Sequence, residues 1–396
     1  MSLSFALSKP LVDYGRAIRE WGVSECRPYA READERHRTP ENWSKILDTA
    51  PVPLGRHDLP HPEPKPTFEE SNWVRDVVFY ESINYGDVWV QPALGGGIGH
   101  LVVSAMGTPE QVERWHDPVV SGGLTTAFAL TEPQFGSDTS QVATTATRDG
   151  DAWVLNGTKI FCSAGGTAEY IVVFATTDKS LRGKGVSAFV VPKGTPGLVV
   201  AKFNENKLGI RCWITSELVF DNCVIPVENQ LGWTADAAGG PKQSGHSGAL
   251  AALAFNRPNM GAMAIGLAQA SLDVTTKLLA ERKVGFTPHR WSSIQGELAK
   301  MDHVLARGRR LLFQSQYLVG RGTPDGAAAA MAKGYPPQTC ERLIRRCMQL
   351  LGPEGTSKDL LLEKWYRDVK IMDIFEGSGQ VQRIVVGRTL MGRLVS

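Results

Sequence analysis

The sequence predicts an α+β protein in which a helical N-terminal region, an antiparallel β domain and a C-terminal helical bundle follow one another. Three successive patterns predict this order. Apolar residues recur at helical spacing in the first part, short apolar or alternating runs replace them in the middle, and long helical periodicity returns afterwards. We therefore expect three domains, at residues 1–124, 125–232 and 233–396.

The N-terminal region begins with helix-like apolar spacing over residues 8–50. Six prolines then occur within 51–66, which predicts an extended connection at the surface. The helical pattern resumes at residue 68 and is interrupted by Gly95-Gly96-Gly97-Ile98-Gly99. This run lacks both G-x-x-x-x-G-K-[ST] and G-x-G-x-x-G, so we expect a tight turn or close helix packing and not a phosphate loop.

The middle region consists of short runs bounded by Gly, Pro, Asn or Asp, as is typical of strands. Asn156-Gly157 between two of the runs predicts a two-residue hairpin turn. We therefore expect an antiparallel β domain with strands at 127–130, 152–155, 170–175, 186–191, 198–203 and 217–222.

The C-terminal region begins after a predicted linker at 239–248. Beyond it, apolar residues recur at steps of three, four or seven, which places one apolar stripe on a helix. Similar periodicity in three later segments predicts a helical bundle. The stripe consists of Met260, Met263, Leu267, Val274 and Leu278, and the later segments are 294–318, 340–351 and 381–390.

Composition excludes several classes of protein. The 43 Lys and Arg against 41 Asp and Glu give a net charge of +2, so nothing indicates a nucleic-acid partner. No apolar run approaches the roughly 20 residues needed to cross a membrane, and the N-terminus does not resemble a signal peptide, so we expect a cytoplasmic protein. The six cysteines form no C-x-x-C pair and the eight histidines no H-E-x-x-H motif, so we expect no metal site.

Three segments carry candidate chemistry. In Phe128–Asp138, Thr131 and Ser137 could donate hydrogen bonds to a ring heteroatom and a phosphate, and Gly136 lets a backbone approach closely. An ordinary Asx or Ser turn is the alternative interpretation.

The second segment is Asn156–Ser163, a strand that ends in an aromatic residue and a hydroxyl. Phe161 could pack on a flat cofactor or simply belong to the core.

The third segment runs from Trp365-Tyr366-Arg367-Asp368 to Gln380. Within it Glu376 lies between an aromatic residue and a glycine, just before a helix begun by Ser378. Such a carboxylate would be partly desolvated, as a base that acts near neutral pH requires. A surface glutamate at a helix end is the alternative interpretation.

Taken together and in this order, the three segments resemble the acyl-CoA dehydrogenase family. The resemblance covers the whole chain, with its best agreement from Phe128 to Arg383. It implies an N-terminal helical domain, a middle β domain and a C-terminal four-helix bundle, with FAD held between the β domain and the bundle, usually in a tetramer. The motifs that carry it are Thr131-Glu132-Pro133-x-x-Gly136-Ser137-Asp138, Lys207-Leu208-Gly209-Ile210-Arg211, and Tyr366-Arg367-Asp368 through Glu376-Gly377.

The resemblance implies α,β-dehydrogenation of an acyl-CoA to a trans-2-enoyl-CoA. Glu376 matches the base that removes the α-proton while a hydride leaves Cβ for flavin N5. Gly377 would offer its N–H to the thioester carbonyl, and Phe375 would form an apolar wall beside the base. An electron-transfer flavoprotein is the implied electron acceptor.

The resemblance also implies the contacts of FAD and of CoA. Leu130 and Thr131 would lie beside the isoalloxazine ring, Gly136 and Ser137 at the pyrophosphate, and Phe161 and Ser163 against the flavin. Arg257 would contact CoA, as would Ser137. Further FAD contacts are implied for Arg282, which would reach the cofactor of a neighbouring subunit, for Gln349 and Gly352 on the adenosine side, and for Ser378 and Gln380.

The chain departs from the family pattern at four places. The segment 284–292 is one residue shorter and lacks a Gln, and Pro353 replaces the second Gly of a Gln-x-x-Gly-Gly pattern. Asn256 stands where an acidic residue often precedes the Arg, and the Pro-rich stretch at 51–66 replaces a Pro-Glu-x-x-Gly-Gly segment. Two alternative functions stay open. One is a flavin oxidase or monooxygenase on the same scaffold, because Glu376 does not exclude oxygen as the electron acceptor. The other is a non-catalytic subunit of a hetero-oligomeric dehydrogenase, which the altered segment 284–292 would permit.

Overall fold

The computed structural model describes residues 7–52, 54, 72–122, 124–234 and 245–395. Most of the predicted Pro-rich connection and the part of the predicted linker before Gly245 lie outside the described residues. The chain forms two compact units. The first contains residues 1–91, 208–211 and 254–396, and the second contains 92–207 and 212–253. The predicted three-domain division stays a prediction, because helical regions grouped in one unit are compatible with either two or three domains.

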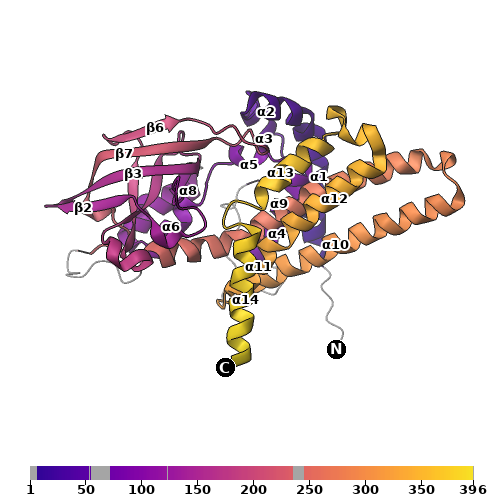
Figure 1. Cartoon of the computed structure of the whole chain (residues 1–396). Helices are drawn as coiled ribbons and strands as arrows, with labels where there is room; N and C mark the ends of the chain where they lie inside the picture. The colour runs from indigo at the N-terminus through magenta and orange to yellow at the C-terminus, as the bar shows by residue number, and fades with distance from the viewer. Residues whose placement is uncertain (1–6, 53, 55–71, 123, 235–244, 396) are drawn as a thin grey trace. The chain divides into compact units, whose positions relative to one another are not determined.

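The first unit is helical, with long C-terminal helices (Figure 1). Its N-terminal elements are α1 (Lys9–Trp21), η1 (Gly22–Cys26), η2 (Arg27–Tyr29), α2 (Ala30–Arg36), α3 (Trp43–Leu47) and α4 (Asn72–Gly86). Its C-terminal elements are α9 (Gly245–Glu281, here from residue 254), η8 (Lys283–Gly285), α10 (Pro288–Gly320), α11 (Gly326–Gly334), α12 (Pro336–Leu351), η9 (Gly352–Thr356), η10 (Lys358–Leu360), α13 (Leu362–Met372) and α14 (Gly379–Val395).

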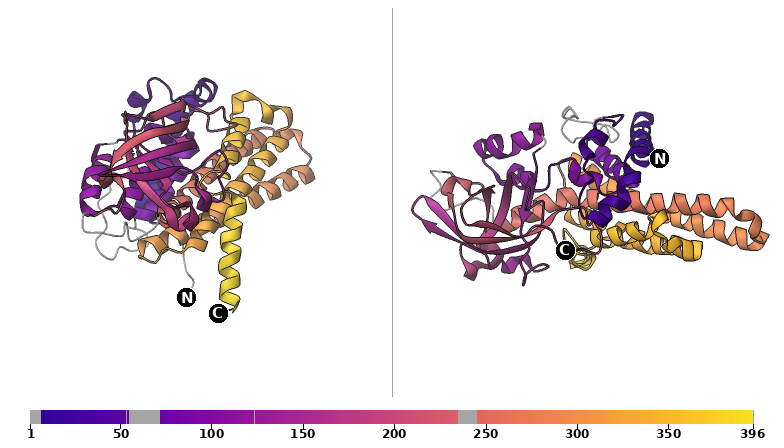
Figure 2. Two further views of the ribbon diagram at one scale, coloured as in Figure 1. Left: turned by 60° about the vertical axis from the view of Figure 1, so that its left-hand side comes forward. Right: turned by 90° about the horizontal axis from the view of Figure 1, so that it is seen from above.

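Helix α9 forms the core of this unit, where α9, α10 and α12 run alongside one another (Figure 2). Residues 256–268 of α9 are all buried, so the predicted stripe of Met260, Met263 and Leu267 is only part of a helix that is buried on every side. A Cβ on Gly266 would come within 2.2 Å of the Glu81 carbonyl oxygen, which shows how closely α4 approaches α9.

The second unit contains a seven-stranded sheet among the described residues, with the path β1-β4-β2-β3-β7-β6 and β5 paired to β4. Most pairs are antiparallel, as predicted, but β1 pairs with β4 in parallel, and so does the end of β2. The strands are β1 (Thr126–Ala129), β2 (Thr145–Asp149), β3 (Ala152–Ser163), β4 (Tyr170–Thr176), β5 (Val186–Pro192), β6 (Leu198–Lys202) and β7 (Thr215–Pro226). The remaining elements are α5 (Val90–Ala93), which straddles the unit boundary, α6 (Gly99–Met106), α7 (Pro109–Gln111), η4 (Val112–His116), α8 (Asp117–Gly122), η5 (Thr139–Gln141), η6 (Lys179–Gly185) and η7 (Val227–Asn229).

Both faces of the sheet are covered where β4 runs. Ile171 and Val173 belong to one hydrophobic cluster, whereas Val172 and Phe174 belong to a second that includes Val102 of α6. Because successive side chains of a strand point to opposite faces, a strand covered on both faces must be apolar throughout. This explains the uninterrupted apolar run that identified β4 in the sequence.

The predicted hairpin at Asn156-Gly157 is wrong. Gly157 lies inside β3, beside a shift in the register with β7, and the β2–β3 turn instead contains Gly150. A Cβ on Gly157 would come within 2.8 Å of the Cα of Thr144. The glycine therefore permits close approach at a bulge and does not make a turn.

The glycine run at 95–99 packs closely against the strand β1, whereas a tight turn or close packing of helices was predicted. A Cβ on Gly97 would come within 2.1 Å of the Thr126 carbonyl oxygen, and one on Gly99 within 2.6 Å of the Ala127 carbonyl oxygen. Gly97 also has a φ of 91°, which favours glycine. The run therefore positions the start of α6 on the strand that leads into Thr131.

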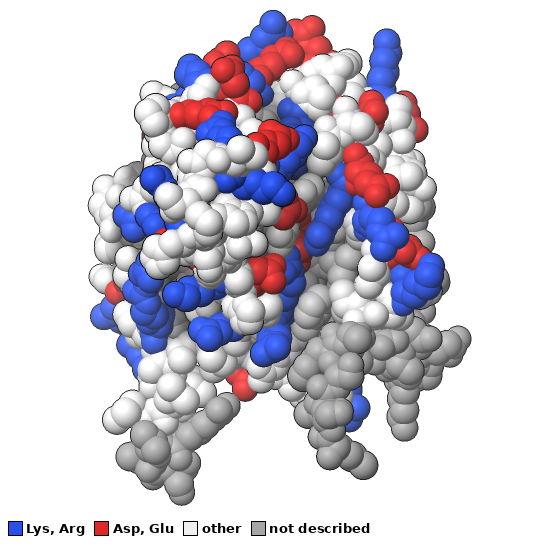
Figure 3. All heavy atoms as spheres, turned by 90° about the vertical axis from the view of Figure 1, so that its right-hand side faces the viewer, with Lys and Arg blue, Asp and Glu red and all other residues white. Residues whose placement is uncertain are grey.

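Basic and acidic side chains are intermixed on the face drawn in Figure 3. Among the described residues, no helix is both long and apolar enough to cross a membrane.

Candidate active site

Glu376 lies in a tight turn between α13 and α14, and its backbone is left-handed with a φ of 56°. Gly377 follows with a φ of 88°, and a Cβ at that position would come within 2.5 Å of Gln382 Nε2. A left-handed conformation is unfavourable for a glutamate and persists only when its surroundings hold it in place.

Three side chains hold this turn by its carbonyl oxygens. Arg257 Nε donates to the Glu376 carbonyl at 3.2 Å. Gln382 Nε2 donates to the same oxygen at 3.2 Å and to the Gly377 carbonyl at 2.9 Å. Lys333 Nζ donates to the carbonyls of Gly377 and Asp373, at 2.6 and 3.0 Å. Residues of α9, α11 and α14 therefore hold the turn in its unfavourable conformation.

The carboxylate itself is half-buried and accepts a hydrogen bond from Asn256 Nδ2, at 2.6 Å from Oε1. Lys333 is fully buried, and this burial lowers its pKa to about 8, although Glu376 and Asp373 act in the opposite direction. Burial likewise lowers the pKa of Arg257, and Glu376 opposes that shift. The turn therefore places a carboxylate in a partly desolvated environment with cations around it.

The other predicted residues of this turn have different surroundings. Phe375 and Ser378 are half-buried, whereas Gln380 is exposed. Ser378 Oγ accepts a hydrogen bond from Val381 N at 3.4 Å, as expected of a residue that caps α14.

In the second unit, the segment after β1 lies against β3. Ile160 N donates to the Thr131 carbonyl at 2.9 Å, so Thr131 and Phe161 are neighbours although they are far apart in sequence. Leu130 is buried, Thr131 is half-buried, and Phe161 and Ser163 are exposed. Phe161 is 58% exposed and has a φ of 55° at a break in the β3–β7 register. An exposed aromatic residue in a left-handed conformation costs free energy, and such strain is typical of functional sites.

Ser137 and Gly136 lie in the exposed loop after Thr131. A Cβ on Gly136 would meet only Thr131 Cγ2, at 3.7 Å, which is ordinary van der Waals contact. Packing within the chain therefore does not explain this glycine, whereas close approach of a ligand to the backbone would.

A third group of predicted residues lies at the C-terminal end of α12. Gln349 and Gly352 line a cavity of about 470 Å³ together with Tyr366 and others. Arg282 forms an ion pair with Glu354, which lies in η9 together with Gly352. The structure thus brings Arg282 into the neighbourhood of Gln349 and Gly352.

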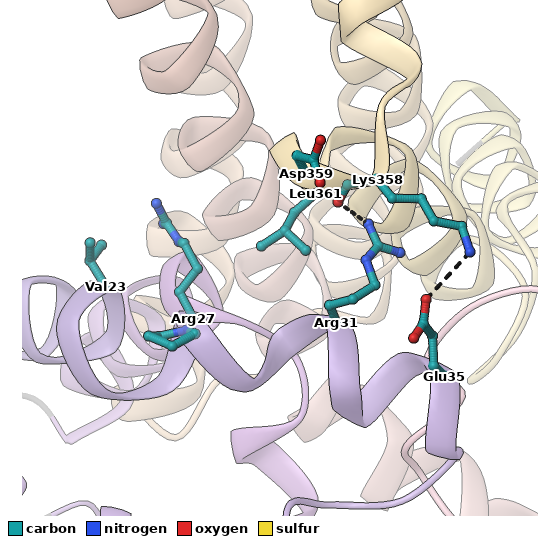
Figure 4. Close-up of a pocket in the computed structure, with 8 residues that line it drawn as sticks. Val23, Arg27, Arg31, Glu35, Lys358, Asp359 and Leu361 are labelled. Carbon is teal, nitrogen blue, oxygen red and sulfur yellow. Dashed lines mark hydrogen bonds and ion pairs between the residues drawn. The ribbon is translucent and has the colours of Figure 1, made fainter.

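A separate cavity of about 680 Å³ lies between η1, η2, α2 and η10 (Figure 4). Arg31 donates to the Lys358 carbonyl, and Lys358 Nζ lies 3.3 Å from Glu35 Oε1. Because these cations already have partners within the chain, the cavity carries no catalytic assignment. Among the described residues, no group of three or more His, Cys, Asp or Glu could hold a metal ion.

Comparison with known proteins identifies the family of the chain. The middle and C-terminal domain models of acyl-CoA dehydrogenase match residues 127–223 and 243–391. The bovine mitochondrial short-chain specific acyl-CoA dehydrogenase is 34% identical over 383 residues, which are 95% of this chain and 89% of that protein. The chain belongs to the acyl-CoA dehydrogenase family. It is therefore an oxidoreductase.

Solved structures agree with this assignment. Butyryl-CoA dehydrogenase from Megasphaera elsdenii is 28% identical with a TM-score of 0.85, over 98% of this chain and 100% of that one. A chain in the structure of the electron transferring flavoprotein of Acidaminococcus fermentans is 30% identical with a TM-score of 0.83, over 98% of this chain and 99% of that one. These similarities confirm the predicted fold.

Membership of the acyl-CoA dehydrogenase family implies FAD as the cofactor. The residues of each unit fit a flavin nucleotide. In the second unit, the strained and exposed Phe161 lies beside Thr131, and no packing contact within the chain requires a glycine at Gly136. In the first unit, Gln349 and Gly352 line a cavity.

The family motifs also contain residues that sequence reasoning left without a role. Glu132 and Lys159 form a buried ion pair at 2.8 Å, and Lys159 Nζ also donates to the Leu130 carbonyl at 3.2 Å. Burial would raise the pKa of Glu132, but Lys159 and the Thr144 hydroxyl hold that pKa below its usual value. In the sequence, a lysine within an otherwise alternating strand is the signal that could have indicated this ion pair. In the structure, the pair holds Thr131 next to β3.

Proposed function

We propose that the chain catalyses FAD-dependent α,β-dehydrogenation of an acyl-CoA thioester to a trans-2-enoyl-CoA, with Glu376 as the base. The observation that carries this proposal is the position of Glu376, whose main chain is held left-handed by Arg257, Lys333 and Gln382 while Asn256 binds one carboxylate oxygen. A carboxylate held so firmly in a partly desolvated turn is organised to remove a proton at a fixed place.

In the proposed reaction, Glu376 removes the α-proton of the acyl group, which the thioester makes acidic. The Gly377 N–H would stabilise negative charge on the thioester carbonyl, and Phe375 would form an apolar wall beside the reacting carbons. The protein's cations favour the ionised base, because Arg257 and Lys333 both act electrostatically on Glu376. FAD, when bound, supplies the acceptor for the hydride that leaves Cβ.

We assign FAD contacts to residues in each unit. In the second unit these are Leu130, Thr131, Gly136, Ser137, Phe161 and Ser163, and in the first Arg282, Gln349, Gly352, Ser378 and Gln380. The fit of Phe161, Gly136 and the cavity at Gln349 supports this assignment. Arg257 and Ser137 are the proposed CoA contacts.

The proposed electron acceptor is an electron-transfer flavoprotein, because a similar chain is part of the solved structure of such a protein from Acidaminococcus fermentans. Relatives named for short-chain or butyryl substrates make a short acyl-CoA the first substrate to test. Assembly as a homotetramer and a cytoplasmic location are parts of the same proposal.

Anaerobic mixing with butyryl-CoA tests the proposal, with the absorbance of oxidised flavin as the signal. We expect the parent protein to bleach and Glu376→Gln to bleach at least roughly 10²-fold more slowly, because the amide cannot take the proton. The variant should still contain FAD. Glu341→Gln, a change to a half-buried glutamate that bonds Lys370 at 3.1 Å, is the matched control and should bleach like the parent.

Bleaching of Glu376→Gln at nearly the parental rate would show that the base lies elsewhere. If the parent bleaches with none of a panel of straight, branched and cyclic acyl-CoAs, the dehydrogenase proposal is wrong. Rapid reoxidation of the bleached parent by O₂ in the absence of a protein acceptor would instead favour the oxidase alternative.

A further inference from the structure

Three buried amide side chains form a continuous row that ends at the Glu376 carboxylate. Gln316 Nε2 of α10 donates to Asn259 Oδ1 at 3.2 Å, and Asn259 Nδ2 donates to Asn256 Oδ1 at 3.3 Å. Asn256 Nδ2 completes the row by donating to Glu376 Oε1 at 2.6 Å. Asn256 is 5% exposed, and the other two amides are fully buried.

The hydrogen bonds of this row fix the direction of every amide. An ionised carboxylate can only accept hydrogen bonds, so Asn256 must present its NH₂ group to Glu376 and its oxygen to Asn259. Asn259 must then present its NH₂ group to Asn256 and its oxygen to Gln316. The row therefore points its donors toward the carboxylate from end to end, and such aligned dipoles reinforce one another in a low-dielectric interior.

The row and the nearby charged side chains bind at different places in the turn. Arg257 of α9 and Lys333 of α11 donate to carbonyl oxygens of the turn, and Asp373 accepts at its own carbonyl from Lys333. Arg257 and Lys333 favour the ionised carboxylate. Asn256, in contrast, binds Oε1 directly.

We propose that Asn256 is a positioning residue, oriented by Asn259 and Gln316, which binds Oε1 of the ionised Glu376 and thereby holds the carboxylate in place for removal of the α-proton. This rests on the proposed function of Glu376 as the base. The proton passes from the substrate Cα to the carboxylate, the electron pair of the broken C–H bond stays with the substrate, and the amides transfer neither protons nor electrons. A carboxyl group still accepts a hydrogen bond after protonation, so the row needs no rearrangement during the reaction.

The first test is the pH dependence of flavin bleaching by butyryl-CoA. The acid limb of this profile is the pH range in which protonation of Glu376 slows bleaching. Asn256→Leu removes the donor to the carboxylate, so the acid limb should move to higher pH by about one unit. Asn256→Asp should move it further, because two adjacent carboxylates must share a proton. Gln316→Met acts only through the orientation of Asn259 and should cause a smaller shift in the same direction. Ser271→Ala, at a buried α9 residue that bonds only within its helix, is the control and should leave the limb in place.

A second measurement needs no substrate. Infrared difference spectra of each variant against its own Glu376→Gln derivative isolate the carboxylate signal of Glu376 as the pH is changed. Loss of this signal should occur at higher pH in Asn256→Leu and Asn256→Asp than in the parent. Circular dichroism identifies any variant that does not fold, and Asn256→Leu alone suffices if Gln316→Met fails.

Unchanged acid limbs and infrared midpoints in folded Asn256→Leu and Asn256→Asp would overturn the positioning role, whatever their rates. This outcome is distinct from failure of the proposed function. If Glu376 is not the base, Glu376→Gln bleaches like the parent and the kinetic limb does not follow the infrared midpoint.

Discussion

Asp368 accepts a hydrogen bond from the main-chain N–H of Ile210 at 2.6 Å, which joins two segments 158 residues apart. The same carboxylate receives Lys364 Nζ at 2.8 Å, and Lys364 also bonds both oxygens of Asp87. Burial raises the pKa of Asp368, and Lys364 opposes that shift. The two motifs that contain Ile210 and Asp368 are therefore structural partners.

Gly209 should tolerate no side chain. A Cβ there would come within 2.2 Å of the Arg367 carbonyl oxygen, so Gly209→Ala must push residues 208–211 away from α13 and weaken the bond from Ile210 to Asp368. We expect the free energy of unfolding in urea to fall by at least about 2 kcal/mol. Gly296→Ala is the control, because nothing lies within 4 Å of its Cβ position, and it should stabilise α10 by about 0.5–1 kcal/mol. Equal effects of the two changes would contradict this prediction.

Lys159→Met should leave the buried carboxylate of Glu132 without its cation. Removing one partner of a buried pair costs about 3–5 kcal/mol, whereas an exposed pair contributes about 1 kcal/mol or less. The control is therefore Lys193→Met, since Lys193 lies 3.7 Å from Glu169 with both side chains more than half exposed. Urea unfolding of both variants measures the difference. A loss below about 1 kcal/mol for Lys159→Met would mean that water or other hydrogen bonds compensate Glu132.

Phe161→Gly should raise the stability of the flavin-free protein and weaken FAD binding. Glycine relieves the left-handed conformation, which costs a phenylalanine about 1 kcal/mol or more, but it removes the ring that we assign to the flavin. We expect FAD to bind about tenfold more weakly, as loss of one aromatic contact of about 1.4 kcal/mol requires.

Thermal unfolding of the flavin-free protein and calorimetric titration with FAD measure the two effects. Phe203→Gly is the control, because Phe203 is exposed to a similar degree but has no left-handed conformation. It should lower stability and leave FAD binding within twofold of the parent. Normal FAD binding by Phe161→Gly would remove Phe161 from the cofactor site.

Lys333 should make stability increase with pH between about 8 and 10.5. Its pKa is about 8 in the folded protein against an ordinary value of 10.5, so in this window the unfolded chain binds more protons, and the free energy of unfolding rises with pH. The rise that depends on Lys333 should be about 2–3 kcal/mol. Comparing the pH slopes of the parent and Lys333→Met isolates it, with Lys277→Met, at an exposed lysine of α9, as the control. Parallel slopes in the parent and Lys333→Met would mean that folding does not lower the pKa of Lys333.

Sequence patterns predicted the order of helical, β and helical regions because periodicity follows directly from burial on one face or on two. The run Tyr170–Ala175 predicted β4 for this reason. The short polar strand β2 was not predicted, since Thr145–Asp149 is mostly solvent-exposed and lacks an apolar pattern. Asn156-Gly157 misled the prediction, because a glycine required for close approach and a glycine required for a turn look identical in sequence.

By itself, the sequence determined the fold class, the family and the candidate set around Thr131 and Glu376, because motifs and periodicity are local properties of the chain. Only the tertiary structure decided what surrounds them: the neighbourhood of Thr131 and Phe161, the pair of Lys159 with Glu132, and the amide row from Gln316 to Glu376. Most of these contacts join residues that are far apart in sequence. The physical reason is that burial makes each polar group find a partner, and that partner is chosen by the packing of whole elements and not by neighbouring residues.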